Sequence, residues 1–312
     1  MTDLLDLSII IPVTERHDEI TELYRAYKQG VAACGKRYEF VFVLDGDYPQ
    51  VFQSLRDLIK QGEGIKIVKL AKAFGEATAL NIGFEKSTGA VIMTLPAYEQ
   101  IKSSEICRLV GGLADHDMVV TRRWPRIDSW LNRLQSSVFN SMLRLITDLP
   151  FHDLGCGVRV FKRQVAKEVH LYGDQHRFFP LLAYRLGFKV LELEAPQSEK
   201  DAFRRIYSPG IYIRRMLDLL TVFFLIKFTK KPLRFFGLLG SGVFSIGAVV
   251  TLWLVIERMF YAVPLADRPA LVLASLMIVL GIQIFAIGLI GELIIFTHAK
   301  SMKEYAIAEV IN

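Results

Sequence analysis

Residues 65–100 read IKIVKLAKAFGEATALNIGFEKSTGAVIMTLPAYEQ, and this stretch decides the fold. It begins with a β-branched run at 65–70 and closes with a second apolar run at 90–95, which Pro96 ends. Between the two runs, residues 74–84 carry apolar side chains at helical spacing. The order strand, helix, strand predicts a βαβ unit of a parallel sheet. Ligands of such sheets bind beyond the carboxyl ends of the strands, so we expect the chemistry directly after the second run.

Two more strands are expected before this unit. Residues 7–13 form one apolar run, 19–33 follow as an amphipathic helix, and 38–44 form the next apolar run, which ends in Asp45-Gly46. A carboxylate at Asp45 can accept a hydrogen bond from the N–H of a base or from a ribose hydroxyl. Asp-Gly is also a common turn former, and the residues alone leave both interpretations open.

Composition and charge narrow the class of protein. The 312 residues are 52% hydrophobic with a mean hydropathy of +0.32, which is high for a soluble protein, and the apolar excess lies near the C-terminus. The net charge of +6 is compatible with nucleic acid, anionic lipid or phosphorylated substrates. Clustering of the cations beside apolar segments favours the last two, and no nucleic-acid partner is expected because the sequence has no such motif.

The three cysteines, Cys34, Cys107 and Cys156, are scattered and follow no spacing pattern. They predict neither a disulfide framework nor a metal knuckle. The simplest interpretation is a reducing cytosol. Residues 1–13 lack a basic region and have too short an apolar run for a signal peptide.

Two long uncharged stretches near the C-terminus predict transmembrane helices. Residues 235–256 and 269–291 hold 22 and 23 residues without a charge. At a rise of about 1.5 Å per residue, each stretch spans the hydrocarbon core of about 30 Å. Lysines and arginines flank the pair on the side of both chain ends, so the positive-inside bias predicts cytoplasmic termini. The expected location is the inner (cytoplasmic) membrane, with a multi-pass topology.

These patterns divide the chain into five predicted segments. They are a cytoplasmic domain at 1–205, juxtamembrane amphipathic helices at 206–234, transmembrane helices at 235–257 and 269–297, and a cytoplasmic tail at 298–312. Glycines in the two spans, Gly240 and Gly281 among them, could allow close helix packing within one chain or between copies. A homo-oligomer is therefore left open.

Arginines alternate with large apolar side chains over residues 121–149. The apolar side chains fall on one helical stripe. Such a helix can lie at a membrane surface with its arginines near lipid phosphate. An ordinary amphipathic helix packed on the sheet is the alternative.

Three segments together resemble family-2 glycosyltransferases, particularly the membrane-bound polyprenyl-phosphate (dolichol-phosphate mannosyltransferase-like) group. They are KAFGEATALNIGFEKSTGAVIMTL at 72–95, HDLGCGVRVFKR at 152–163, and the two-helix tail. The resemblance implies an α/β protein of the GT-A fold, with a Rossmann-like, mostly parallel sheet and a C-terminal transmembrane hairpin. It also implies transfer of a sugar from a nucleotide sugar to a polyprenyl phosphate on the cytoplasmic face, for cell-surface glycan synthesis.

The resemblance further implies a nucleotide-sugar pocket at the strand ends. The residues that it places there are Pro12, Thr14, Glu15, Asp45, Gly46, Lys72, Asn81, Pro96, Ala97 and Arg204. Several of them differ from the family's motif residues. Lys72 as a solvated side chain and Asn81 as a locally bonded helix residue are the alternatives for those two.

The family's metal motif is replaced in this chain. Where the family has Asp-Ala-Asp-Leu-Gln, residues 95–99 read Leu-Pro-Ala-Tyr-Glu. A single carboxylate at Glu99 can help hold Mg²⁺ or Mn²⁺ when substrate phosphates supply other ligands, but it makes a weak site. Glu99 as an exposed loop carboxylate is the alternative, and Lys102 could screen a diphosphate instead.

Acceptor and catalytic roles are implied for six further residues. The acceptor phosphate is assigned to Arg122, Arg123, Arg133 and Ser137, and catalysis to Asp153 and Arg159. Guanidinium suits phosphate because it offers a planar fork of donors. A phosphate acceptor is already largely ionised at neutral pH, so we expect Asp153 to orient more than to deprotonate. An ion pair between Asp153 and Arg159 that fixes a loop is the structural alternative.

A second hypothesis comes from another class. The departures from the family motifs also fit a degenerate, non-catalytic protein that binds polyprenyl phosphate or a partner glycosyltransferase through the same fold. Binding of the lipid without binding of a donor would distinguish this hypothesis from the transferase.

Overall fold

The computed structural model describes residues 5–127, 151–169, 171, 175–201, 232–261, 264 and 268–298. The chain forms two compact units, one of Met1–Arg214 with Glu304–Asn312 and one of Arg215–Lys303. Three residues of the predicted site, Arg133, Ser137 and Arg204, lie outside the described residues.

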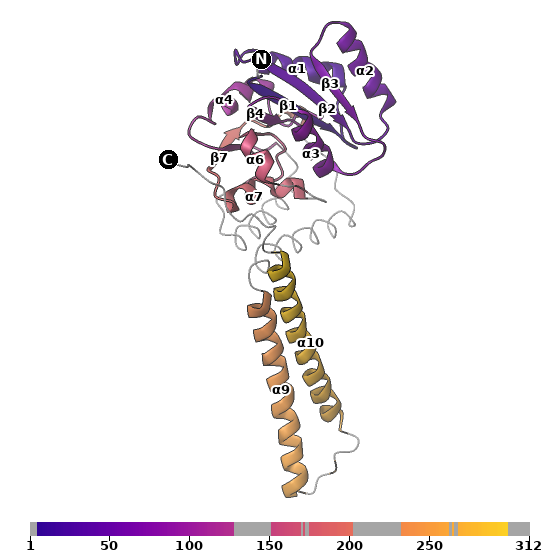
Figure 1. Ribbon diagram of the computed structural model, residues 1–312, viewed down its shortest axis with the longest axis vertical. Helices are drawn as coiled ribbons and strands as arrows, with labels where there is room; N and C mark the ends of the chain where they lie inside the picture. Colours follow the sequence, from indigo (N-terminus) through magenta and orange to yellow (C-terminus); the bar gives the residue numbers. More distant parts are fainter. Residues whose placement is uncertain are drawn as a thin grey trace. The chain divides into compact units, whose positions relative to one another are not determined.

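A seven-stranded sheet organises the first unit, in the order β3-β2-β1-β4-β6-β5-β7 (Figure 1). Its strands are β1 Leu7–Val13, β2 Tyr38–Leu44, β3 Ile65–Lys69, β4 Val91–Thr94, β5 Met118–Arg123, β6 Arg159–Lys162 and β7 Val190–Ala195. Neighbouring strands are parallel except at β6, which runs antiparallel to both β4 and β5. The predicted α/β class with a mostly parallel sheet is confirmed, as are the strands expected at 7–13 and 38–44.

The strand-helix-strand unit of residues 65–100 is present, but its strands are not neighbours. Helix α3 (Glu76–Lys86) connects β3 to β4, and both strands are parallel to the centre of the sheet. Strands β2 and β1 lie between them. Periodicity predicted each element correctly, whereas it contains no information on the strand order.

Helices cover the sheet on both faces. Helices α1 (Ile20–Ala32), α2 (Pro49–Lys60) and α4 (Ile106–Gly111) share one hydrophobic core with alternate residues of β1 and β2. Helix α3 lies against β1 and β2 on the other face. The remaining short elements are α6 Arg163–Glu168, α7 Phe179–Arg185, and the 3-10 turns η1 Ser103–Glu105, η2 Gln175–Phe178 and η3 Glu199–Asp201.

Strand β1 is the centre of this core. All seven of its residues are buried, which explains why its sequence is a continuous apolar run rather than an alternating one. On the α3 side, Gly83 lies directly over Ile10, and a Cβ at Gly83 would overlap the Ile10 side chain. Glycine at this position therefore lets α3 approach the sheet closely.

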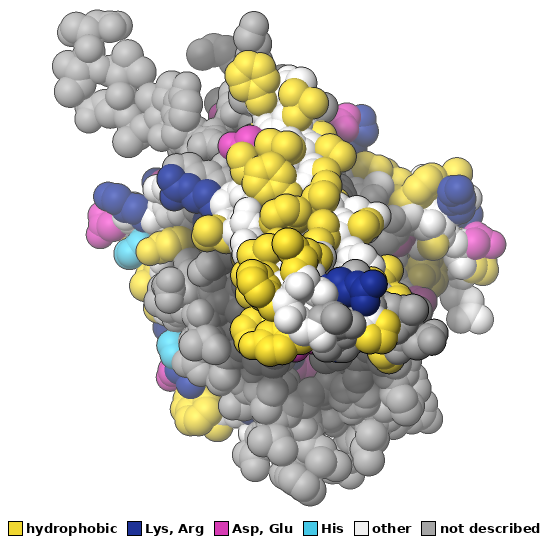
Figure 2. Space-filling model, turned by 90° about the horizontal axis from the view of Figure 1, so that it is seen from below, with side chains coloured by type: hydrophobic (Ala, Val, Ile, Leu, Met, Phe, Trp, Pro, Cys, Tyr) yellow, Lys and Arg dark blue, Asp and Glu magenta, His cyan; other side chains and the backbone are white. Residues whose placement is uncertain are grey.

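Two helices of 30 residues each, α9 (Pro232–Tyr261) and α10 (Pro269–His298), form a hairpin in the second unit (Figure 1). Both are long and apolar enough to cross a membrane. The hydrophobic side chains gather over the hairpin surface (Figure 2). Glycines bring the helices together, because a Cβ at Gly281 would lie 2.5 Å from the Phe244 amide nitrogen. The stretches predicted at 235–257 and 269–297 lie within these two helices.

The cysteine prediction was wrong for one pair. Cys34, just after α1, and Cys107, in α4, form a disulfide across 73 residues, with their Cα atoms 5.1 Å apart. The two cysteines meet because α1 packs closely on the turn that leads into α4. This approach requires glycine at position 30, where a Cβ would overlap the Ser103 carbonyl oxygen. Sequence spacing gives no sign of this tertiary contact. Cys156 is a free, buried thiol.

Candidate functional site

The site lies where the carboxyl ends of β1 and β4 meet. β1 pairs in parallel with β2 on one side and β4 on the other, so the loops after these three strands converge at one edge. Strand order reverses here relative to chain order, and ligands of open α/β sheets bind at such a point. The loop after β4, where we expect the chemistry, therefore lies at this point of the sheet.

Hydrogen bonds fix the backbone of the loop after β4. The Tyr27 hydroxyl lies 3.0 Å from the carbonyl oxygens of both Pro96 and Tyr98, which share its single donor hydrogen. Leu95 and Ala97 are buried in the hydrophobic core, with 0% and 1% of their surface exposed. In this register, the positions matched to the two metal carboxylates thus point into apolar packing.

Arg16 and Tyr98 contact each other across the junction of the two strands. The Arg16 guanidinium carbon lies 3.6 Å from the centroid of the Tyr98 ring, a cation–π contact. Arg16 also forms an ion pair with Asp201, Nη1 to Oδ1, at 3.2 Å. Burial raises the pKa of Tyr98 to about 12, so this side chain is a neutral phenol near neutral pH. The junction therefore presents a cation on an aromatic ring.

A buried ion-pair chain continues from Asp201 to Arg123 and Asp153. Arg123 donates through Nη1 to Asp201 Oδ2 at 2.9 Å, and its Nε and Nη2 donate to the two oxygens of Asp153 at 2.8 and 3.0 Å. Gln197 Nε2 donates to the same Asp201 oxygen at 2.8 Å. Because paired donors satisfy these charges, the cluster can remain ionised in the interior.

Burial affects the pKa values of the two carboxylates in this row of ion pairs, Asp153 and Asp201, to different extents. Burial raises the pKa of Asp153, but the charge and hydrogen bonds of Arg123 outweigh it and hold that pKa below its usual value. For Asp201, burial outweighs the neighbouring Arg123 and Gln197, and the pKa is raised. Asp153 is thus an ionised partner of Arg123. The alternative of an ion pair between Asp153 and Arg159 was wrong, because Arg123 takes that place.

Arg159 is a second buried guanidinium, on β6. It is 3% exposed and donates to two backbone carbonyls, those of His176 at 2.6 Å and Leu154 at 3.4 Å. Its Nε has no hydrogen-bond partner. Burial lowers the pKa of Arg159 to about 10, which still leaves it charged at neutral pH. No carboxylate among the described residues lies within ion-pair distance of it.

The predicted donor residues that the structure describes lie near the end of β1, in the loops that converge on this edge and in helix α3. Both carboxylate oxygens of Asp45 accept from backbone amides at the start of α3, Phe74 at 2.7 Å and Gly75 at 2.9 Å. Gly46 and Gly75 have φ angles of 125° and 98°, which glycine adopts readily. Asp45 therefore joins the end of β2 to the beginning of α3, as turn chemistry predicts.

The remaining donor residues differ in exposure. Pro12 is buried in β1, whereas Thr14 is half-buried and Glu15 exposed in the loop that follows. Lys72 is exposed, with its Nζ 5.3 Å from the Phe74 ring centroid. Asn81 donates to the Leu171 carbonyl, 90 residues along the chain, so the alternative of a locally bonded helix residue was wrong.

The described residues at this edge do not by themselves form a divalent-cation site. Glu99 is half-buried, and its Oε1 accepts from the Ser103 amide at 3.3 Å while its Oε2 accepts from the Ser198 hydroxyl at 3.2 Å. Asp153 and Asp201 are each bound by guanidinium donors. Among the described residues, no three His, Cys, Asp or Glu side chains form a group that could hold a metal ion.

Of the predicted acceptor residues within the described ranges, only Arg122 is accessible. It pairs with Glu194, Nη1 to Oε1, at 2.9 Å, and its guanidinium carbon lies 4.9 Å from the Trp124 ring centroid. Arg123 is enclosed by its two carboxylates. The backbone thus presents adjacent arginines of β5 to different environments.

A family model connects this sheet edge to known chemistry. Residues 8–170, which contain β2 to β6 and all of β1 except Leu7, match the model described as glycosyl transferase family 2. The chain belongs to this family. As a family-2 glycosyltransferase, it has relatives along nearly its full length. An undecaprenyl-phosphate 4-deoxy-4-formamido-L-arabinose transferase of Enterobacter sp. (strain 638) is 30% identical, covering 98% of this chain and 94% of the relative.

Further comparisons extend the likeness. A dodecaprenyl-phosphate galacturonate synthase of Rhizobium johnstonii is 25% identical, covering 95% of this chain and 89% of the relative. A glucosyl-3-phosphoglycerate synthase from Mycobacterium tuberculosis, solved with Mn²⁺, UDP-glucose and phosphoglyceric acid, aligns with a TM-score of 0.52 at 10% identity. That alignment covers 70% of this chain and 79% of the other, and it confirms the GT-A-like fold of this glycosyltransferase.

Asp201 was not predicted at this candidate site, whereas Arg16 and Tyr98 were expected at its strand ends without an assigned role. Arg16 and Tyr98 follow adjacent parallel strands, so their position after β1 and β4 was a usable signal. For Asp201 the sequence contains no such signal, because this residue reaches the site from η3, more than a hundred residues along the chain from Tyr98.

Proposed function

We propose that this glycosyltransferase moves a sugar from a nucleotide-sugar donor to a polyprenyl phosphate at the cytoplasmic face of the inner membrane. One observation carries the proposal: similarity to relatives named as undecaprenyl-phosphate and dodecaprenyl-phosphate enzymes extends over at least 95% of this chain, the apolar hairpin included. The hairpin anchors the enzyme beside its lipid acceptor. Both termini then lie in the cytoplasm.

The donor would bind at the edge formed by β1, β2 and β4. Pro12, Thr14, Glu15, Asp45 and Gly46 lie at the ends of β1 and β2 or in the loops after them. Lys72, Asn81, Pro96, Ala97 and Arg204 complete the proposed set. Asp45 contributes by fixing the start of α3, whose N-terminus favours anionic groups.

Departure of the nucleotide diphosphate places negative charge at this edge. Its stabilisation is the main electrostatic demand of the reaction. Arg16 supplies a fixed positive charge next to Tyr98, at the junction of β1 and β4 where a diphosphate would lie. We therefore assign this role to Arg16, in preference to a metal at Glu99, whose oxygens already accept two hydrogen bonds.

The acceptor side would use Arg122, with Arg133 and Ser137, for the lipid phosphate. Arg122 is the accessible arginine of β5. Among the described residues its ion-pair partner is the half-exposed Glu194, and a phosphate could displace that carboxylate. Asp153 acts as a positioning residue that holds Arg123, and Arg159 contributes a buried positive charge. These roles agree with a phosphate acceptor that needs orientation more than deprotonation.

The test is transfer by the purified full chain in nanodiscs. Undecaprenyl phosphate is supplied with a panel of nucleotide sugars, and the glycosylated lipid is measured by mass spectrometry with Mn²⁺, with Mg²⁺ and with EDTA. Transfer that persists in EDTA supports both the activity and the role of Arg16. Transfer that requires a metal keeps the activity and overturns the role of Arg16.

A non-catalytic lipid-binding protein is the second candidate, favoured by the burial of Leu95 and Ala97 in apolar packing at the positions of the family's two metal carboxylates. The same nanodiscs distinguish it. Saturable binding of undecaprenyl phosphate, with neither binding nor turnover of any donor in the panel, would overturn the transferase and support this candidate.

A further inference from the structure

A polar amide side chain lies in the middle of helix α10. Gln283 is 14 residues from Pro269 and 15 from His298, the two ends of α10. At about 1.5 Å per residue, it is about 21 Å from either end, which is the centre of a membrane-spanning helix. Its side chain is exposed, and its amide forms no hydrogen bond in the described part of the chain.

Two hydroxyl side chains of the hairpin are satisfied locally. The hydroxyl of Thr251 donates to the Gly247 carbonyl, and that of Ser275 to the Val272 carbonyl, both at 2.8 Å. These bonds stay within one helix and remain available in lipid. Gln283 has no equivalent, and an unsatisfied amide in hydrocarbon costs free energy.

Helix α9 does not approach Gln283. The face of α10 toward α9 carries Gly281 and Gly288, whose close neighbours are Phe244 and Phe236. Gln283 follows Gly281 by two residues, which turns its side chain by about 200° around the helix. It therefore points away from the partner helix of its own hairpin.

Gln283 belongs to a regular row on this outer face. The row, named here the outer seam, alternates spacings of three and four residues and consists of Leu273, Leu276, Leu280, Gln283, Ile287, Ile290 and Ile294. Its apolar members are all between 49% and 62% exposed. Such alternation is the a/d pattern of helices that pack along their length, and one polar residue in the pattern fixes the register.

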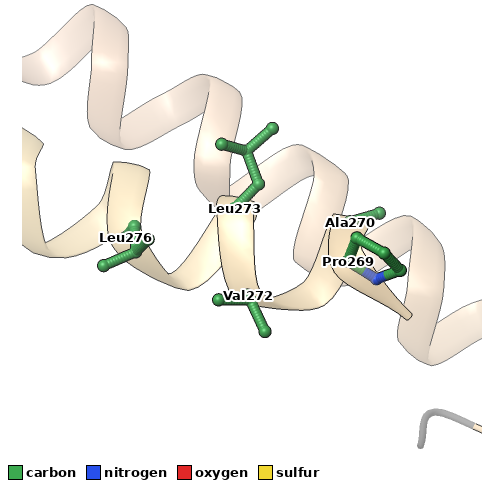
Figure 3. A pocket seen from close by; sticks show the side chains of 5 residues that line it. All are labelled: Pro269, Ala270, Val272, Leu273 and Leu276. Atoms are coloured by element: carbon green, nitrogen blue, oxygen red, sulfur yellow. The ribbon is translucent and has the colours of Figure 1, made fainter. Parts of the chain in front are cut away.

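A hollow marks the beginning of the outer seam. Leu273 and Leu276 line it together with Pro269, Ala270 and Val272 (Figure 3). The lining side chains are all apolar, and the hollow is wide open to the surface. Exposure of leucine and isoleucine alone is expected for a helix in lipid, whereas the unsatisfied amide at the centre is not.

We propose that the outer seam is an interface between two copies of this chain, in which Gln283 of one copy hydrogen-bonds Gln283 of the second. An amide offers both donors and acceptors, so it is complementary to itself. All copies insert with the same orientation, and residue 283 therefore lies at the same depth in each, across a two-fold axis normal to the membrane. The seam carries no charge that would repel its copy.

This proposal rests on the insertion of the hairpin into a membrane, which is part of the proposed function. Alkaline carbonate extraction of the expressed protein tests insertion by itself. Release of the wild-type chain into the soluble fraction would overturn insertion, and the interface with it. Transfer activity is not a readout of the interface, so failure of the transferase is distinguishable from failure of the seam.

The experiment measures association of the full chain in lipid vesicles by energy transfer between labelled copies, as the vesicles are diluted with lipid. Gln283→Leu should weaken association about tenfold, because interhelical polar contacts in membranes are of that size. Gln283→Asn should retain part of the affinity. The matched control, Gln283→Leu with Leu289→Gln, keeps the composition, moves the amide off the seam and should remain weak.

Cross-linking gives a second measurement that does not depend on an affinity change. Oxidation of Gln283→Cys should give a covalent dimer on a non-reducing gel, while Leu289→Cys and the wild type should not. Unchanged association of Gln283→Leu, or equal cross-linking at 283 and 289, would overturn the proposal.

Discussion

Arg123 holds Asp153 through two parallel hydrogen bonds, Nε to Oδ2 at 2.8 Å and Nη2 to Oδ1 at 3.0 Å, and both side chains are buried. The pair joins the end of β5 to the segment before β6. The resemblance implies that Arg123 binds the acceptor phosphate and that Asp153 acts in catalysis. In the structure the two side chains instead bind each other and connect two segments at the edge of the site. The other edge of the same guanidinium holds Asp201, and through it Arg16.

Removing one member of this pair should destabilise the protein strongly. Arg123→Gln leaves the buried Asp153 charge without its partner, and breaking a buried pair in this way costs about 3–5 kcal/mol. The measurement is thermal and denaturant unfolding of the full chain in detergent. Arg122→Gln is the matched control, expected to change the free energy of unfolding by less than about 1 kcal/mol because its pair is partly exposed. Equal effects of the two variants would contradict the structural role of Arg123.

Stability should fall in acid through Asp153. Its pKa in the folded protein lies below the usual value of 3.8, so its contribution is complete above pH 3.8 and is lost as the pH falls through the lower, folded-state value. Asp201 acts in the opposite sense, since its pKa is raised: its contribution is present below pH 3.8 and is lost as the pH rises through the folded-state value. Asp153→Asn should flatten the acid limb of a melting profile between pH 2.5 and 7. An unchanged acid limb would exclude this assignment.

Arg16 should matter for turnover more than for folding. Its side chain is 36% exposed, and Arg16→Gln removes the positive charge beside Tyr98 while leaving the sheet intact. We expect kcat to fall about 10²-fold, the size of losing one electrostatic contact to a developing charge. Arg16→Lys should recover part of the rate. Arg56→Gln, an exposed arginine of α2, is the control and should leave kcat unchanged.

The oxidation state of Cys34 and Cys107 should report both stability and location. Oxidised, unfolded protein should show one reactive thiol, Cys156, and three after reduction. Reduction should lower the free energy of unfolding by about 2–4 kcal/mol, since the disulfide closes a long loop. In cells, a cytoplasmic placement predicts that all three label as thiols. Protection of Cys34 and Cys107 in intact cells would contradict that placement.

Gly83 should resist substitution because of one contact. Gly83→Ala places a Cβ against Ile10 in the centre of the sheet and should cost about 1–3 kcal/mol through overpacking. Gly111→Ala is the matched control, since nothing lies within 4 Å of a Cβ there. Melting temperatures of the two variants test the comparison. A neutral Gly83→Ala would mean that α3 can move away from β1.

Local pattern predicted the elements well and their partners poorly. The runs that became β1 and β2 were found because continuous apolar stretches of that length are typical of buried parallel strands. The βαβ unit was found by the same signal, but its two strands lie apart in the sheet. Periodicity records which face of an element is buried and contains no information about which neighbour buries it.

Functional residues were likewise predicted where a local pattern marks them and missed where distant contacts decide their role. Asp45 was singled out from a local Asp-Gly turn, and a turn-like contact to Phe74 and Gly75 is what the structure shows. Asp201 was missed because its role depends on Arg16 and Arg123, which come from two other strand ends. The predicted roles of the donor and acceptor residues stay predictions until turnover is measured.

The sequence by itself determined the α/β class, the core strands and the two apolar helices, since each follows from side chains spaced within one segment. Only the tertiary structure decided the strand order, the Cys34–Cys107 disulfide and the partner of Asp153. These depend on contacts between segments far apart in the chain, whose free energy is set by packing and by the satisfaction of buried charge. Such contacts leave no periodic trace in the residues that make them.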